Sequence, residues 1–421
     1  MGEKICITDL AEPQLTAQQQ AAIAYTDTLQ IDLTMQSILA EAMQITGLSD
    51  FGPEDFRERL SLLCEEWSRN PNLRNIGRLT LRNKLLQHAN SRLLIQDLLC
   101  RHPEIHAVQI NAPIIVAGLP RSGTTHLLNL MGADSRLRAL PLWESYEPVP
   151  MPGEKPDENG VDPRYTRCDE TWQMMQAMSP LLAAMHPMNP GHIHEELELM
   201  GPDFASYNYE WLSHSPRWRD HYYATDQLPH YEYMKTVMKI LTWQDGDTTG
   251  ENTRWVLKCP QHLEQLNVLH SVFPRSTIAV THRDPVSVIQ SAATMLAYGQ
   301  RLNRDSVDTQ GLIEYWSDRV VHLLEACVRD RDALPAQQCI DVLFHEFMAD
   351  DMAMVERIYD RAGLPMNDQA RAELAGYIQR HPRGKHGQVY NLRGDFGVEP
   401  AALRARFDFY FERFPVQVEV H

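Results

Sequence analysis

The chain has 421 residues, of which 43% are hydrophobic and 23% charged, and its formal net charge is −17. This composition is that of an ordinary globular protein. The negative charge argues against a nucleic-acid partner, because a phosphate backbone is bound by a positive protein face.

The N-terminus and the cysteines bear on location. No apolar run reaches membrane-spanning length, and the polar start of the chain has no apolar segment of the kind found in secretory signals. Cys6 stands where a myristoylation motif has Ser or Thr. The seven cysteines are scattered without a CxxC pair, which favours a reducing, cytoplasmic location and gives no sign of a zinc site.

The first 112 residues are expected to form a helical layer packed on the rest of the chain. Apolar side chains recur at mostly helical spacing over 33–45, 56–67 and 81–98. We interpret these stretches as amphipathic helices with a structural part only.

From residue 113 the pattern changes to short apolar runs, each followed by a helical stretch. The expected strands are 114–116, 255–257, 277–281 and 340–344. Buried strands alternating with helices predict an α/β fold over residues 113–421, in which helices flank a P-loop-like parallel sheet. Sheets of this kind bind ligands at the carboxyl ends of their strands.

Residues 150–250 interrupt this alternation. They are rich in Met, Trp, Tyr, His and Pro and show no clean period. We expect a mostly helical insertion that caps the ligand end of the sheet.

Residues 118–125 (GLPRSGTT) follow an expected strand and open an expected helix, as a phosphate-binding loop does. The amides of Ser122, Gly123, Thr124 and Thr125 and the positive helix N-terminus can hold an anion. A nucleoside-triphosphate loop would have Lys in place of Thr124, whereas here the cation comes earlier, as Arg121. The alternative interpretation is a Gly-rich turn of a Rossmann-like sheet.

A second motif lies at the end of the 277–281 strand. It reads His282-Arg283-Asp284-Pro285, and Asp284 and Pro285 suit the first positions of a helix. Ser291 follows Arg283 by eight residues. Two anion sites on neighbouring strand ends predict a ligand with phosphates at two places, although Arg283-Asp284 alone could be a surface ion pair.

Together, Pro120-Arg-Ser-Gly-Thr-Thr125 and Arg283-Asp-Pro with Ser291 resemble the signature of sulfotransferases that use phosphoadenosine phosphosulfate (PAPS). The form with Arg121 is similar to the bacterial and tyrosylprotein branches. The resemblance implies that the first motif binds the 5′-phosphosulfate of PAPS. It also implies that Arg283 and Ser291 bind the 3′-phosphate, and that no metal is required.

The resemblance extends from residue 113 to about residue 397. Trp255-Val-Leu-Lys258 resembles the strand that ends in a lysine near the transferred group. Phe344-His345-Glu346 resembles the segment beside the adenine, and His126 occupies the place of an adenine-side aromatic residue. Arg383 and Lys385 stand in a segment similar to the basic loop that closes over the 3′-phosphate.

The resemblance also implies roles in the transfer. Arg121 is expected to bridge the sulfate and the 5′-phosphate, with Lys258 as second cation. Three candidates for the general base stay open: His262 first, which we expect to face the cleft, then Glu144, then His194 with Glu195.

The expected reaction moves a sulfuryl group from PAPS to a hydroxyl of a small molecule and releases PAP. The Met- and aromatic-rich insertion favours an apolar alcohol, phenol or lipid as acceptor, although the same residues could be core. Two other functions remain open: a P-loop kinase or NTPase, and a non-catalytic nucleotide-binding protein of the same fold. No nucleic acid and no membrane span are expected.

Overall fold

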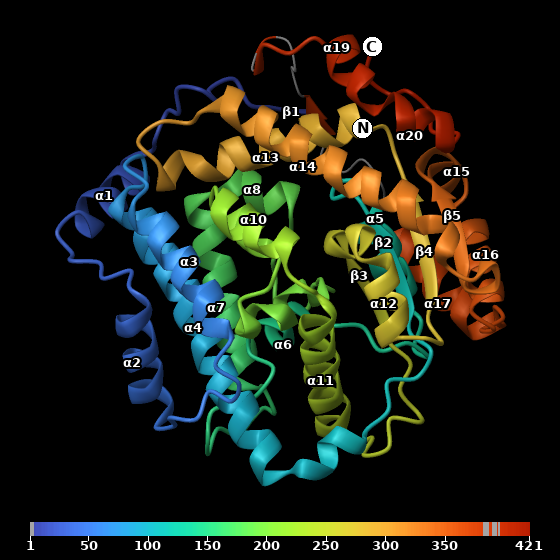
Figure 1. The fold of residues 1–421 in the computed structure, drawn as a ribbon, viewed down its shortest axis with the longest axis horizontal. Coiled ribbons are helices and arrows are strands. Elements are labelled where there is room, and N and C mark those ends of the chain that lie inside the picture. Colours follow the sequence, from blue (N-terminus) through green and yellow to red (C-terminus); the bar gives the residue numbers. More distant parts are fainter. Residues whose placement is uncertain (1–3, 382–386, 390–393, 395) are drawn as a thin grey trace.

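The computed structural model of the protein describes residues 4–381, 387–389, 394 and 396–421. Its centre is a four-stranded parallel sheet. The strand order is β3-β2-β4-β5 (Figure 1). Their bounds are β2 Ile114–Gly118, β3 Val256–Cys259, β4 Thr277–His282 and β5 Cys339–Leu343. All four lie within two residues of the stretches that the sequence predicts, and every residue of β2, β3 and β4 is buried.

Helices cover both faces of the sheet, which confirms the predicted α/β class. Successive side chains of a strand point to opposite faces. Ile115 and Ala117 therefore join one core, while Ile114 and Val116 join another. The first core is completed by α11 Leu228–Gln244, α12 Leu266–Val272, α13 Pro285–Asn303 and α14 Thr309–Asp330. The second is completed by α5 Thr124–Met131, α16 Asp351–Arg361 and α17 Asp368–Arg380.

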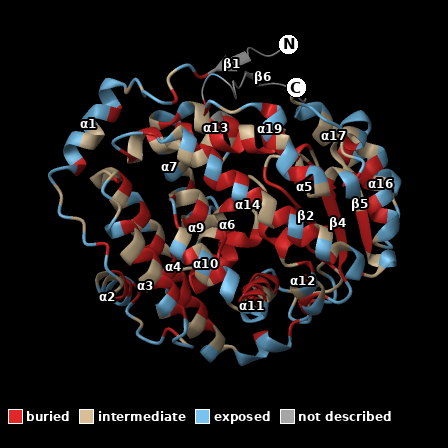
Figure 2. Cartoon of the chain, turned by 45° about the horizontal axis from the view of Figure 1, so that its top comes forward, coloured by how far each residue is buried: buried red, intermediate tan, exposed pale blue. Residues whose placement is uncertain are grey.

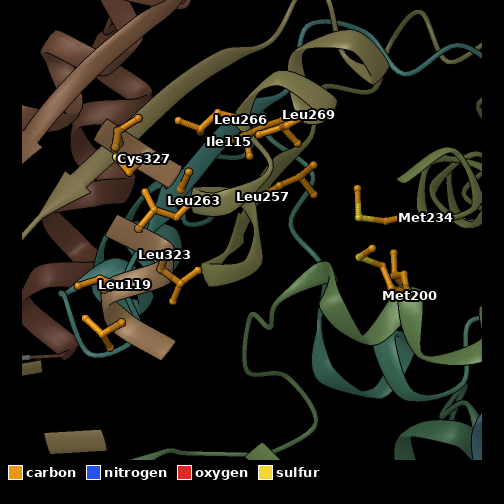
Figure 3. Packing of buried hydrophobic residues seen from close by; sticks show 14 of the residues in the cluster. Ile115, Leu119, Met200, Met234, Leu257, Leu263, Leu266, Leu269, Leu323 and Cys327 are labelled. Atoms are coloured by element: carbon orange, nitrogen blue, oxygen red, sulfur yellow. The ribbon is translucent and has the colours of Figure 1, made fainter. Parts of the chain in front are cut away.

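Figure 3 shows part of the first core. Ile115 and Leu257 of the sheet lie among leucines that follow β3, in the 3-10 helix η3 Pro260–Glu264 and in α12. The sequence pattern predicts one helix here, but Gln265 separates two short ones.

The N-terminal part is helical, as predicted. Its helices are α1 Ala17–Thr26, α2 Met35–Thr46, α3 Phe56–Ser68 and α4 Asn75–Arg101. Trp67 of α3 shares a buried cluster with Phe204, Tyr209 and Trp218 from the insertion. The N-terminal helices therefore pack on the insertion, and the division of the chain at residue 112 stays a prediction.

The insertion is mostly helical and lies beside the N-terminal layer (Figure 1). The short helix α6 Leu142–Tyr146 precedes it. Its helices before α11 are α7 Pro163–Met178, α8 Pro180–Met185, η2 Glu196–Asp203, α9 Asn208–Leu212 and α10 Pro216–Ala224. Much of its aromatic content is core, since Tyr207, Trp218 and Tyr231 are buried (Figure 2 shows the buried residues in red). Met174, in contrast, is 68% exposed.

Shorter elements complete the chain. They are η1 Pro103–Ala107, η4 Arg331–Ala333, η5 Ala336–Gln338, α15 Phe344–Ala349, α19 Pro400–Arg404, η6 Ala405–Phe407 and α20 Asp408–Arg413. A second, two-stranded sheet pairs β1 Lys4–Cys6 with β6 Gly387–Val389 in parallel. In the described part of the chain, no helix is both long and apolar enough to cross a membrane.

Candidate functional site

The strand order brings the predicted anion-binding segments to one edge of the sheet. β2 lies between β3 and β4, with Val116 opposite Lys258 and Gly118 opposite Thr281. The loop after β2 is therefore flanked by Lys258 on one side and by Arg283, which follows β4, on the other.

The segment between β2 and α5 has the strand–turn–helix form of a phosphate-binding loop. Gly118 is required because a Cβ there would lie 1.8 Å from Oγ1 of Thr281. Gly123, just before the first residue of α5, has φ +82°, and a Cβ there would also lie 3.0 Å from the ring of Phe344. The amides of the first turn of α5, including those of Thr124 and Thr125, have no intrahelical carbonyl partner and can donate to an anion.

Arg121, Ser291 and Arg283 come together beside this loop. Nε of Arg121 donates to Oγ of Ser291 at 3.0 Å, and a guanidinium nitrogen of Arg283 donates to the carbonyl of Arg121 at 2.5 Å. Arg121 has φ +63°, a left-handed backbone that costs a non-glycine residue roughly 1–3 kcal/mol. The contacts from two other segments hold the loop in this conformation.

The side chain of Ser122 is used inside the loop. Its hydroxyl donates to the carbonyl of Leu119 at 2.5 Å and lies 3.0 Å from the hydroxyl of Thr281. The hydroxyl therefore fixes the loop to β4, which leaves the backbone of this segment to contact a ligand.

Lys258 faces the loop from β3. It is 2% exposed, and its Nζ lies 3.4 Å from Oγ1 of Thr125 and forms an ion pair with Glu195. Its amide donates to Oε2 of Glu196 at 2.9 Å. Two consecutive glutamates of the insertion thus contact the same lysine.

His262 and Glu144 lie away from Lys258. His262 is completely buried, with Nε2 2.5 Å from Glu196 and Nδ1 3.0 Å from the hydroxyl of Tyr231. It does not face the cleft as expected from the sequence, because both ring nitrogens are directed into the protein. Glu144 pairs with Arg138 at 2.5 Å, and burial raises the pKa of its carboxyl.

A cavity of about 730 Å³ adjoins the loop and holds the third base candidate. Lys258, Thr125, His194 and Glu195 line its inner end, whereas His262 and Glu144 do not line it. Its walls come from α4, α7, α8, α9, α13 and the segments around them. The apolar side chains that line it are those of Leu73, Leu81, Met174, Met175, Leu182, Met188, Leu197, Trp211, Leu212, Met295 and Leu296.

Three histidines cluster near Lys258, of which His194 is buried and His186 and His192 are half-buried. The ring centroids of His186, His192 and His194 lie 5.9 to 6.4 Å apart. Burial lowers the pKa of His192 to about 4 and that of His194 to about 3, and it holds the pKa of His186 well below 6.5. All three are therefore neutral near pH 7.

Glu195, next to His194, has a pKa that is raised and not lowered. Burial raises the pKa of its carboxyl, and the ammonium of Lys258 opposes that rise. A carboxylate with a raised pKa takes up a proton more readily than an ordinary one.

The expected adenine side is partly described. His126 lies 3.1 Å from a carboxylate oxygen of Asp351, with the rings of Phe347 and Tyr377 at 5.5 and 6.2 Å. His345 is half-buried at the start of α15. Arg383 and Lys385 lie outside the described residues.

The structure also shows an acidic partner of Arg283 that no sequence pattern indicates. Glu419, near the end of the chain, accepts from Nε and from a terminal nitrogen of Arg283 at 2.8 and 2.7 Å. The amide of Glu419 donates to the helix-capping carboxylate of Asp284 at 2.8 Å, and Phe344 lies under the guanidinium at 3.9 Å. The carboxylate of Glu419 thus accepts hydrogen bonds from the arginine that we expect to bind a phosphate.

The N-terminal layer contributes a second charged pair. Lys84 of α4 lies on the cavity wall, 2.8 Å from Oε2 of Glu198 and 3.9 Å from the ring centre of Tyr146. Because α4 forms one wall of the cavity, the expectation that the N-terminal helices are only structural does not hold for α4. The sequence signal for this role is Lys84 itself, a lysine within the apolar helical stretch 81–98.

The comparisons with known proteins agree with this geometry. A model of the sulfotransferase family matches residues 113–368, more than half of the chain. Sulfotransferase STF1 from Mycobacterium tuberculosis H37Rv has a similar structure, with 27% identity, a TM-score of 0.78, and 90% of this chain and 100% of that one covered. Sulfotransferase STF9 from Mycobacterium avium matches in fold at 24% identity and a TM-score of 0.82, over 93% of this chain and 100% of that one. The sequence matches none of the curated proteins compared with it.

Proposed function

The chain belongs to the sulfotransferase family, and we propose that it transfers a sulfuryl group from PAPS to a hydroxyl of a small, largely apolar acceptor. The observation that carries this proposal is the meeting of Arg121, Ser291, Arg283 and Lys258 around one glycine-bearing loop. Two groups of anion donors side by side suit a donor with phosphates at two places.

The residues present fit PAPS by their chemistry. The first turn of α5 and Arg121 offer donors to the 5′-phosphosulfate. Arg283 and Ser291 offer donors to the 3′-phosphate, and His126 with Phe347 offers an aromatic wall to the adenine. Since Thr124 replaces the lysine of nucleoside-triphosphate loops, we favour sulfuryl transfer over phosphoryl transfer.

We propose Glu195 as the general base. It lines the cavity, and its partner Lys258 is the cation nearest to Thr125. When Lys258 turns to the sulfuryl oxygens, the carboxylate of Glu195 is released to the acceptor hydroxyl. The acceptor oxygen then bonds to sulfur, its proton goes to Glu195, and the bond from sulfur to the 5′-phosphate oxygen breaks, with its electron pair leaving on PAP.

His262 fits a positioning part in this scheme. Glu196 accepts from the amide of Lys258 and contacts His262, which also contacts Tyr231. The chain Tyr231–His262–Glu196 therefore fixes the end of β3 that carries Lys258.

The test is calorimetric titration with PAP and with ATP, which has no 3′-phosphate, followed by transfer of labelled sulfate from PAPS in the presence of EDTA. We expect PAP to bind at least about tenfold more tightly than ATP and transfer to continue without divalent metal. A charge-assisted hydrogen bond of about 1.5–3 kcal/mol gives at least this ratio. Equal affinity for the two nucleotides would contradict the 3′-phosphate site at Arg283 and Ser291.

A further inference from the structure

One cation of the cavity lies far from the loop that we assign to PAPS. Arg304 follows the last residue of α13 and is 8% exposed. Its guanidinium donates to Oγ of Ser213 at 3.1 Å. Within the described residues no carboxylate forms an ion pair with it, although it lines the cavity.

The two lysines of the cavity differ from Arg304 in this respect. Lys258 forms an ion pair with Glu195, and Lys84 forms one with Glu198. A buried guanidinium without an ion-pair partner is costly. Burial lowers the pKa of Arg304, and the charge of Asp308 only partly opposes this lowering. A negative group entering the cavity would relieve this cost.

Neutral donors surround Arg304 at this end. The amide side chains of Gln300 and Asn303 line the cavity, and neither is hydrogen-bonded to a described residue. Gly77 of α4 brings the two helices into contact here, because a Cβ on it would lie 2.6 Å from the carbonyl of Asn303. The cavity is therefore lined, where α4 meets the end of α13, by a cation and two amides.

The distance between the two ends follows from α13. Ser291 contacts Arg121 at the loop, and Met295, Leu296, Gly299 and Gln300 line the cavity along the helix toward Asn303. At 1.5 Å per residue, Ser291 and Asn303 are about 18 Å apart along the axis. An extended chain advances about 1.2 Å per atom, so roughly fifteen chain atoms would span the cavity.

We propose that Arg304 binds the carboxylate of the acceptor, and that the acceptor is a long-chain hydroxy acid with its hydroxyl at Glu195 and Lys258. This rests on the proposed function. The apolar walls of the cavity suit the chain, and its volume lies within the range of small-molecule sites. A single cation matches one negative charge, whereas a phosphate monoester would bring up to about two.

The test compares ω-hydroxypalmitate with its methyl ester, which has the same chain without the charge. Calorimetric titration is done on the protein alone and with PAP bound. We expect the wild type to bind the acid about 10- to 100-fold more tightly than the ester, the ratio given by a charge-assisted hydrogen bond. Equal binding of the acid and the ester would overturn the proposal without any variant.

Three variants assign the effect to Arg304. Arg304→Gln should lower the affinity for the acid to that for the ester and leave the ester and PAP unchanged, while Arg304→Lys should keep part of the preference. Arg301→Gln is the matched control, because Arg301 is a buried arginine of the same helix that pairs with Asp9. A preference that survives in Arg304→Gln would overturn the proposal. Failure of PAP to bind would instead count against the proposed function, since the acid and ester titrations on the protein alone do not depend on it.

Discussion

At the scale of single residues, the site depends on buried charges that hold one another in place. Lys258 is 2% exposed and has Glu195 beside it, and Glu196 holds its amide. The carboxylate of Glu195 offsets part of the cost of burying this cation. In the mechanism that we propose, this pair presents a cation to the donor and a carboxylate to the acceptor.

Lys258→Ala tests the cation. We expect turnover to fall at least about 10²-fold, because a preorganised cation facing charge that develops during transfer contributes this much. Steady-state kinetics with labelled PAPS measures the change, and circular dichroism checks the fold. Lys235→Ala is the control, since Lys235 donates to the carbonyl of Val272 and does not line the cavity. Near-normal turnover in Lys258→Ala would show that the end of β3 does not lie at the reaction centre.

Glu195→Gln tests the base. The amide keeps the size of the side chain but takes up no proton, so turnover should fall about 10²- to 10⁴-fold with PAP binding retained. In the wild type, kcat should rise with pH as the carboxyl of Glu195 loses its proton. Burial raises its pKa, so the rise should occur above the ordinary glutamate range.

Glu144→Gln is the matched control for this variant. Glu144, like Glu195, is half-buried and forms an ion pair, in its case with Arg138, but it does not line the cavity. A Glu144→Gln variant that loses turnover while Glu195→Gln keeps it would contradict the assignment. His262→Ala should lower the melting temperature, because it leaves Oε1 of Glu196 and the hydroxyl of Tyr231 without their hydrogen-bond partner.

At the scale of elements, the segment after α20 crosses the start of α13. Glu419 pairs with Arg283 there, and the amides of Glu419 and Val420 donate to Asp284. An ion pair with a carboxylate and one with a phosphate use the same guanidinium nitrogens. On our proposal that Arg283 binds the 3′-phosphate, donor binding displaces Glu419 from Arg283.

Glu419→Gln should strengthen PAP binding. Arg283 and Glu419 are partly exposed, and a pair of this kind contributes up to about 1 kcal/mol, or about fivefold in Kd. Calorimetric titration at low and high salt measures the change, which should shrink as salt screens the pair. Glu412→Gln changes the same charge at an exposed position of α20 and serves as control. Unchanged or weaker PAP binding would show that Glu419 does not compete with the donor.

At the scale of the whole molecule, a chain of net charge −17 encloses a cavity that is locally positive. The described residues that line it include four cations, Lys84, Arg121, Lys258 and Arg304, and two carboxylates, Glu195 and Glu198. The positive charge is thus concentrated where anionic ligands are expected, while the rest of the surface is acidic. This arrangement favours entry of anions into the cavity over binding elsewhere.

Buried neutral histidines predict how stability changes with pH. Burial lowers the pKa of His88 and His192 to about 4 and of His194 to about 3. The unfolded chain therefore takes up protons first, from about pH 6.5 downward, and the free energy of unfolding should fall as pH drops through this window. Each histidine contributes up to about 1.4 kcal/mol per pH unit.

Chemical denaturation between pH 7 and pH 5 measures this slope. His192→Gln removes one of the three groups without touching the cavity lining, so the slope should decrease by up to about 1.4 kcal/mol per pH unit. His381→Gln is the control, because His381 is exposed. A slope that His192→Gln leaves unchanged would show that His192 does not titrate on unfolding.

The sequence by itself determined the four strands and the glycine-bearing turn at 118–125 between a strand and a helix. It also placed Arg283 and Ser291 in one motif, whose part in binding a 3′-phosphate stays a prediction. These features are local: burial pattern, glycine positions and helix-capping residues lie within a few positions of one another. Asp284 caps α13 as expected, and the four strands lie close to their predicted stretches.

Only the tertiary structure decided which side chains meet. Glu195 contacts Lys258 and lines the cavity, whereas packing directs His262 into the core, against Glu196 and Tyr231. Glu195 is 63 positions from Lys258, and Glu419 is 136 positions from Arg283. Sequence patterns report which face of its own element a residue occupies. The direction of a side chain in a loop or short helix is set by whatever distant element packs there, so these contacts followed only from the folded chain.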